Sequence, residues 1–136
     1  MITSVKNAKI KMVRELLGSK KHREKTRSLV IEGVRFAEES LAANAHPVFC
    51  LFSAQISERG QQILDQMRTL SVEMDEVSVD LMDRLSDTKT SQGILLVTAY
   101  PEMPLSSRID SAIVLDQISD PGNMGTILRT AVALGV

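Results

Sequence analysis

The residues with the clearest chemical potential lie near the C-terminus, in the run Asp120-Pro121-Gly122-Asn123-Met124-Gly125 and at Arg129. An apolar run at residues 113–115 precedes them and predicts a short, buried parallel strand that leads into a polar turn. Apolar residues then recur at spacings of three and four through residue 134, which predicts a helix whose apolar face packs back on that strand. This apolar face consists of Ile127, Leu128, Ala131 and Leu134.

Arg129 lies off the apolar face, about one and a half turns into the expected helix. In α/β sheets, ligands are bound by the loop that follows a strand and by the first turns of the next helix. The free amides of that turn favour an anion, and a guanidinium binds phosphate through two parallel hydrogen bonds. The pattern therefore predicts a site for a phosphate group.

The spacing of Asn123, Gly125 and Arg129 after a strand resembles the first signature of the SpoU (TrmH-like) RNA ribose 2′-O-methyltransferases. The resemblance implies methyl transfer from S-adenosylmethionine to a ribose 2′-oxygen, with Arg129 and Asn123 as catalytic residues and Pro121 and Gly125 in the motif loop. A guanidinium keeps its proton, so we favour Arg129 as a phosphate anchor that stabilises the developing alkoxide over Arg129 as the base. Asn123 would orient the loop or Arg129, or cap the last helix, and these roles are compatible.

Composition indicates a globular chain of 136 residues that is 43% hydrophobic and 24% charged, with few aromatic residues and no tryptophan. The single cysteine, Cys50, excludes an internal disulfide and is expected to be a buried thiol. The N-terminus has no signal-peptide pattern, and no apolar run is long enough to cross a bilayer. These features predict a cytoplasmic protein without a membrane partner. His22 has no second ligand at a suitable spacing, so no metal site is expected.

Charge is distributed unevenly along the chain. Residues 1–30 hold nine lysines and arginines against two acids, a charge of +7, and the remaining residues carry −8. Such a basic segment is typical of polyanion binding, although a solvated helix face is the simpler interpretation. The residues predicted to contact RNA are Lys9, Lys11, Arg14, Lys20, Lys21, Arg23, Lys25, Arg27 and, in a later polar turn, Lys89.

Hydrophobic periodicity predicts alternating helices and strands. A first helix begins at Ser4 or Asn7 and ends at Gly18, and residues 19–27 form a short helix or a mobile loop. Strands are expected at 28–32, at 48–52 as a buried parallel strand, at 72–77 on a sheet edge, and at 94–100. Further helices are expected at 34–43 with Phe36, Ala37 and Leu41 buried, and at 80–86. Another is expected at 57–70, capped by Ser57, with Ile63, Leu64 and Met67 inward.

This alternation predicts an α/β fold with three layers, α/β/α, over residues 1–100. A proline-containing linker at 101–111 separates it from residues 112–136. The polar turn at residues 88–93 is either a simple connection or a loop that contacts phosphate.

The N-terminal part also resembles the SpoU family. Residues 7–11, 20–27, 29–33 and 91–94 are similar to the RNA substrate-binding domain that precedes the methyltransferase domain in many of its members. That domain has a fold similar to ribosomal proteins that bind kinked RNA. The resemblance implies RNA as a partner, rRNA in preference to tRNA, and a homodimer in the complete enzyme.

Two later SpoU signatures, which form the knotted pocket for S-adenosylmethionine, have no counterpart in this sequence. Residues 112–136 are therefore expected to be the first strand and helix of a truncated SPOUT methyltransferase domain. We expect the chain to bind no S-adenosylmethionine and to be inactive alone. The alternatives are a free-standing module that binds structured RNA without catalysis and a nucleotide-binding α/β protein, although the sequence has no Gly-x-Gly-x-x-Gly.

Overall fold

The computed structural model describes residues 1–86, 90–102, 104 and 107–136. It divides into two compact units, Met1–Glu102 and Met103–Val136. Lys89 and the start of the polar turn lie outside the described residues.

A four-stranded sheet forms the centre of the first unit. Its strands are β1 (Ser28–Glu32), β2 (Pro47–Phe52), β3 (Glu73–Glu76) and β4 (Ile94–Ala99), in the order β1-β4-β2-β3. β4 pairs antiparallel with β1 and with β2, whereas β2 and β3 are parallel. The predicted edge strand at 72–77 is confirmed as β3. The predicted parallel strand at 48–52 is parallel on its β3 side only, because an apolar run reports burial on both faces and not the direction of the neighbouring strands.

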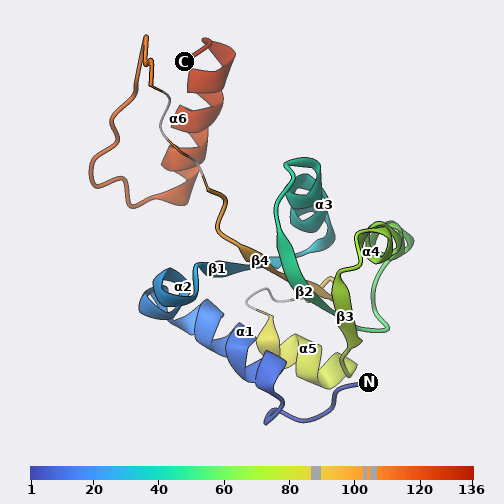
Figure 1. The fold of residues 1–136 in the computed structure, drawn as a ribbon. Helices are drawn as coiled ribbons and strands as arrows, with labels where there is room; N and C mark the ends of the chain where they lie inside the picture. Colours follow the sequence, from blue (N-terminus) through green and yellow to red (C-terminus); the bar gives the residue numbers. More distant parts are fainter. Residues whose placement is uncertain (87–89, 103, 105–106) are drawn as a thin grey trace. The chain divides into compact units, whose positions relative to one another are not determined.

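Helices cover both faces of the sheet, which confirms the three-layer arrangement (Figure 1). α1 (Ala8–Gly18) and α5 (Val79–Leu85) pack on one face, and α3 (Val34–Ala42) and α4 (Glu58–Thr69) pack on the other. Each face of the sheet therefore has its own hydrophobic core, and successive residues of β4 alternate between the two, as the pleat of a strand requires. Leu95 and Val97 pack in the core with α1 and α5, and Ile94 and Leu96 pack in the core with α3 and α4.

The structure decides between two pairs of alternatives for the first helices: which residue caps the first one, and whether residues 19–27 form a helix or a loop. Asn7, not Ser4, caps α1, since its side chain accepts a hydrogen bond from the backbone amide of Lys9 at 2.9 Å. Residues 19–27 are mostly helical and form α2 (Lys20–Thr26), which ends at Arg27 in a left-handed conformation with φ 51°. Ser57 caps α4 through the amide of Gly60, as predicted, and Ile63, Leu64 and Met67 are buried.

The prediction that Phe36 is buried is wrong. Its side chain is 62% exposed, and the buried face of α3 consists of Val34, Ala37 and Leu41. These three residues are spaced by three and four, so they share one face of the helix, and Phe36 lies beside it.

The second unit contains α6 (Pro121–Ala133) and no strand among its described residues. The predicted strand at 113–115 is therefore wrong for this chain, and Val114 is 90% exposed. A strand needs a neighbour for its backbone hydrogen bonds, and no described strand of this unit supplies one. α6 buries none of its residues, so its apolar face does not pack as predicted.

Candidate functional site

The predicted catalytic motif lies in the first turns of α6. The carboxylate of Asp120 caps this helix by accepting a hydrogen bond from the backbone amide of Asn123 at 2.7 Å, and Pro121 occupies the first helical position. Asn123 lies inside the first turn, so its suggested role as the N-cap is wrong. Asp120 takes that role because its position immediately precedes the proline, which suits the start of a helix.

The guanidinium of Arg129 lies along the surface of α6 towards Gly125. Its Nη2 donates to the Thr126 hydroxyl at 3.4 Å, and a Cβ added at Gly125 would lie 3.1 Å from its Nη1. Gly125 therefore leaves room for the guanidinium. Asn123 and Arg129 are both exposed, and no hydrogen bond joins their side chains in the described part of the chain. Their catalytic roles stay predictions.

Lys9, predicted to contact RNA, is bound within the fold. Its ammonium pairs with Glu73 at 2.7 Å and with Asp75, both on β3, and lies 5.4 Å from the centre of the Phe49 ring. Partial burial lowers the pKa of Lys9. The hydrogen bonds and charges of Asp75 and Glu73 together raise it by more than burial lowers it, so the net shift of the pKa is upward. The positive charge of Lys9 is compensated by two carboxylates and contributes little to an RNA-binding surface.

Two further basic residues have structural contacts. Arg23 Nη1 donates to the carbonyls of Leu16 and Leu17, at 2.6 and 3.2 Å, and so satisfies carbonyls at the end of α1. The Arg27 guanidinium lies 5.3 Å from the centre of the Tyr100 ring.

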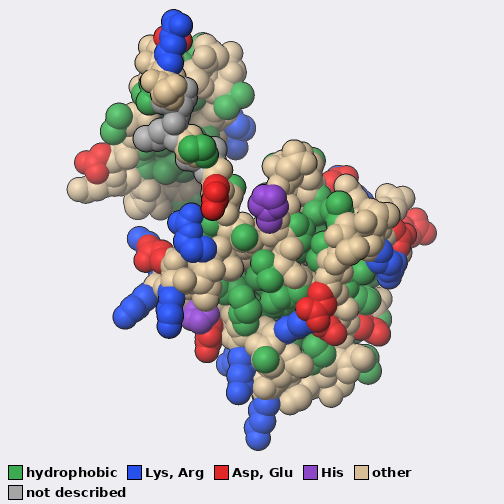
Figure 2. Space-filling model, in the orientation of Figure 1, with side chains coloured by type: hydrophobic (Ala, Val, Ile, Leu, Met, Phe, Trp, Pro, Cys, Tyr) green, Lys and Arg blue, Asp and Glu red, His purple; other side chains and the backbone are tan. Residues whose placement is uncertain are grey.

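The remaining basic side chains project into solvent. Lys20 pairs with Glu24 at 3.7 Å, whereas no described acid pairs with the other four. These four are Lys11 and Arg14 on α1, and Lys21 and Lys25 on α2. Lys11 and Arg14 are three residues apart and Lys21 and Lys25 four apart, so each pair shares a helix face. Figure 2 shows lysine and arginine side chains protruding where α1 and α2 lie. We call these four residues the basic surface.

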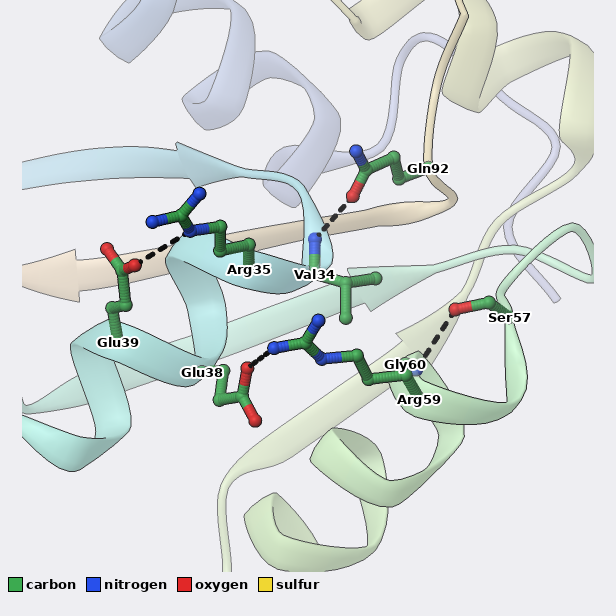
Figure 3. Close-up of polar contacts among 8 residues, drawn as sticks. All are labelled: Val34, Arg35, Glu38, Glu39, Ser57, Arg59, Gly60 and Gln92. Atoms are coloured by element: carbon green, nitrogen blue, oxygen red, sulfur yellow. Dashed lines mark hydrogen bonds and ion pairs between the residues drawn. The ribbon is translucent and has the colours of Figure 1, made fainter.

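A second candidate site, missed by the sequence analysis, lies where α3 and α4 begin. β1 and β2 run in the same direction, so the helices that follow them both start at one edge of the sheet. The Gln92-Gly93 turn reaches the same edge, because β4 runs in the opposite direction and starts there. Figure 3 shows the side chains that meet at this point.

Gly33 and Gln92 shape the start of α3. Gly33 adopts φ 95° and ψ 150°, a conformation that side-chain-bearing residues avoid. Because Gly33 has no side chain, the Gln92 side chain can approach the start of α3, where its Oε1 accepts a hydrogen bond from the Val34 amide at 2.8 Å. Gln92 thus supplies the cap that the helix otherwise lacks, since Gly33 has no side chain.

Gly60 brings the start of α4 close to α3. A Cβ at Gly60 would lie 2.4 Å from Ile56 Cγ1 and 3.1 Å from Val34 Cγ2, so any larger residue would force Ile56 to move and would crowd Val34 of α3. The close packing places the two helix starts, with their free amides and positive dipole ends, beside each other.

Arg35 and Arg59 lie at the second position of α3 and α4, respectively. Arg35 Nε pairs with Glu39 at 2.9 Å, and Arg59 pairs with Glu38; all four side chains are exposed. Arg35 and Arg59 both line a hollow of about 350 Å³, together with Val34, Gln55, Ser57 and Gln92. Two guanidiniums beside two helix starts form an arrangement suited to an anion. The repeated sequence signal, an arginine two residues after each cap residue, could have indicated this site.

The described residues form neither a metal-ligand cluster nor a membrane-spanning helix. No group of three or more His, Cys, Asp or Glu side chains there could hold a metal ion. Among the helices formed by those residues, none has the length and hydropathy that a bilayer crossing requires.

Residues 7–96 match the protein family described as the MRM3-like substrate binding domain. An uncharacterized tRNA/rRNA methyltransferase of Synechocystis is 31% identical over 139 residues, which cover 99% of this chain and 50% of that protein. The 23S rRNA (guanosine(2553)-2′-O)-methyltransferase RlmP of Bacillus subtilis is 30% identical over 135 residues, with 99% and 51% covered. The chain spans about half the length of these relatives.

Solved structures of RNA methyltransferases also resemble this chain over about half of their own length. The structure of an RNA 2′-O ribose methyltransferase superposes with a TM-score of 0.77 at 30% identity and covers 99% of this chain and 52% of that one. An AdoMet-bound rRNA methyltransferase from Sinorhizobium meliloti superposes with a TM-score of 0.72 at 24% identity, with 99% and 51% covered, and shows a shared fold.

Proposed function

The chain belongs to the MRM3-like substrate-binding domain family, and we propose that its first unit binds RNA for a ribose 2′-O-methyltransferase. The observation that carries this proposal is the match over residues 7–96, followed in the same chain by Asn123, Gly125 and Arg129 at the spacing of the SpoU signature. The relatives act, by their names, on rRNA or tRNA, and rRNA is the substrate class we propose.

The basic surface is the proposed contact with the RNA backbone. Lys11, Arg14, Lys21 and Lys25 are exposed and have no described acid partner, so their charges are available to phosphates. Lys9, Arg23 and Arg27 are left out, because their cationic groups already contact carboxylates, carbonyls and an aromatic ring. Each phosphate contact releases counterions, which makes RNA binding salt-dependent.

We propose that Arg129 anchors the phosphate next to the target ribose and stabilises the developing 2′-oxyanion. A guanidinium stays protonated near neutral pH, so it acts through charge and hydrogen bonds and not as a base. S-adenosylmethionine is the proposed methyl donor, as in the AdoMet-bound neighbour. No side chain of α6 is buried in this chain, so its described residues do not by themselves enclose that cofactor, and we assign them no role in binding it. A homodimer is the assembly we propose for the methyltransferase.

The test of catalysis uses the natural polypeptide that contains residues 1–136, unmodified rRNA and methyl-labelled S-adenosylmethionine. After alkaline hydrolysis, label should survive in alkali-resistant dinucleotides, because a 2′-O-methyl group blocks cleavage at its own phosphodiester. Arg129→Ala should abolish incorporation while RNA affinity is nearly kept, and Arg108→Ala, at another exposed arginine of the second unit, should change neither. Absence of label with salt-sensitive RNA binding would replace the proposal with a binding module that lacks catalysis.

The test of the basic surface is the salt dependence of RNA binding by the chain. Replacing Lys21 and Lys25 with glutamine should weaken binding and reduce the slope of log affinity against log salt by about two, one for each lost phosphate contact. Arg68→Gln, at an exposed arginine of α4 that pairs with Asp65, serves as the control and should leave the slope unchanged. An unchanged slope in the double variant would show that RNA binds elsewhere.

A further inference from the structure

Phe36 is unusual among the three phenylalanines of the chain. Phe49 is buried and Phe52 is partly buried, but Phe36 is 62% exposed on the first turn of α3. It lines two hollows at once. One, of about 310 Å³, is shared with Glu32, Gly33, Arg35 and Gln92. The other is an apolar groove of about 610 Å³ that Phe36 shares with Val30, Ile31, Glu32, Glu39 and Ser40.

The first hollow continues toward cationic groups. Arg35 and Gln92 line both this hollow and the one that contains Arg59 and Ser57. No described side chain accepts a hydrogen bond from the backbone amides of Arg35 and Phe36 at the start of α3. The ion pairs of Arg35 and Arg59 are solvent-exposed and therefore weak, so a phosphate can replace their carboxylate partners with little loss.

The apolar groove that Phe36 also lines has different chemistry. Val30 and Ile31 supply apolar surface, and Glu39 and Ser40 supply oxygen acceptors. Carboxylates repel phosphate but accept hydrogen bonds from the exocyclic amino groups of bases. Phe36 and Glu32 line both hollows, so the aromatic side chain borders the hollow that contains Arg35 and the groove that suits a base.

From these adjoining hollows we propose that an unpaired RNA nucleotide docks here, with its base against Phe36 and its phosphate between Arg35 and Arg59. Bases in a duplex are already stacked and cannot present a face to an aromatic side chain, so the occupant is a nucleotide outside a helix. The proposal rests on the proposed RNA-binding function and adds a contact separate from the basic surface.

The absence of tryptophan from the chain provides a direct test. Phe36→Trp introduces a single indole that keeps the stacking surface, and a stacked base should quench its fluorescence when an in vitro transcript of large-subunit rRNA is added. Leu70→Trp is the matched control, since Leu70 is also exposed, at 57%, at the opposite end of α4. Quenching at position 36 but not at position 70 supports the site, whereas equal quenching at both positions overturns it.

Affinity measurements with the same transcript complete the test. Phe36→Ala should weaken binding about tenfold, the usual effect of losing one aromatic–base stack, and Phe36→Trp should retain the affinity. Arg59→Gln should weaken binding and lower the salt slope by about one, whereas Arg68→Gln, which removes a similarly ion-paired arginine from the other end of α4, should not.

The outcomes separate the two proposals. If the chain binds the transcript and loses affinity through the basic surface only, the nucleotide site is wrong and the RNA-binding function stands. If the chain does not bind the transcript at all, the RNA-binding function fails and the nucleotide site fails with it. Thermal unfolding of each variant should show an intact fold, because the substituted positions are exposed.

Discussion

Gly33→Ala tests the role of the β1–α3 turn in shaping the site. Gly33 adopts φ 95° and ψ 150°, a region that only glycine populates readily. A Cβ at this position would also lie 3.2 Å from Gln92 Oε1, the atom that accepts the hydrogen bond from the Val34 amide. The substitution should therefore strain the backbone and displace the cap of α3 together.

The expected loss is the sum of these two effects. Forcing alanine into this backbone conformation costs about 1–3 kcal/mol. Losing the hydrogen bond between Gln92 and Val34 costs about 1 kcal/mol more, and the reduced entropy of the unfolded chain returns about 0.4–1 kcal/mol. The net destabilisation is about 1–3.5 kcal/mol, and for a unit of about 100 residues each kcal/mol lowers the Tm by roughly 4–8 °C.

Thermal and urea unfolding of the chain measure this prediction. Gly18→Ala is the control, because Gly18 ends α1, has no positive φ and has no atom within 4 Å of an added Cβ. It should be neutral or stabilising by up to about 1 kcal/mol. Gln92→Ala should cost less than Gly33→Ala, and the double variant should be less destabilised than the sum of the two, since both disturb one hydrogen bond. A Gly33→Ala variant that unfolds within about 2 °C of the parent chain would refute the reasoning.

Two further predictions concern buried or paired groups of the first unit. Burial raises the pKa of the Cys50 thiol to about 12, so the stability that its protonated form contributes should be present below the ordinary thiol pKa and be lost as pH rises toward 12. Cys50→Ala should reduce the pH dependence of the free energy of unfolding between about pH 9 and 11, as measured by urea unfolding at several pH values. Lys9→Met should destabilise the fold by about 1 kcal/mol, because Glu73 and Asp75 would lose their cation, whereas Lys20→Met should have no measurable effect. Since the pKa of Lys9 is raised, its contribution to the free energy of unfolding should be full below the ordinary lysine pKa and should disappear as the pH rises through the raised pKa. If the stability difference between Lys9→Met and the parent chain stays constant as the pH rises, the prediction is contradicted.

Local patterns in the sequence determined most of the secondary structure. The cap at Ser57 and the spacing of Ile63, Leu64 and Met67 define α4 because helical hydrogen bonds and side-chain periodicity involve residues only three or four apart. The same locality explains why the motif at Asn123, Gly125 and Arg129 could be recognised from spacing alone.

Residues 113–115 show where a local pattern is not enough. Their apolar character indicated a strand, but strand formation depends on a neighbour that a local pattern does not specify, and the described residues of that unit include none. Helix α6 needs no such partner for its backbone hydrogen bonds, so it is present while its apolar face stays uncovered.

By itself, then, the sequence determined the helices and strands of the first unit, the three-layer arrangement and the family resemblance, since each depends on short-range spacing or composition. Tertiary structure alone decided which charges are paired within the fold and which side chains meet at the starts of α3 and α4. Lys9 meets Asp75 across 66 residues of chain, and Val34 meets Gln92 across 58. Such contacts follow from strand order and from which face each helix covers, and these depend on packing the whole sheet at once.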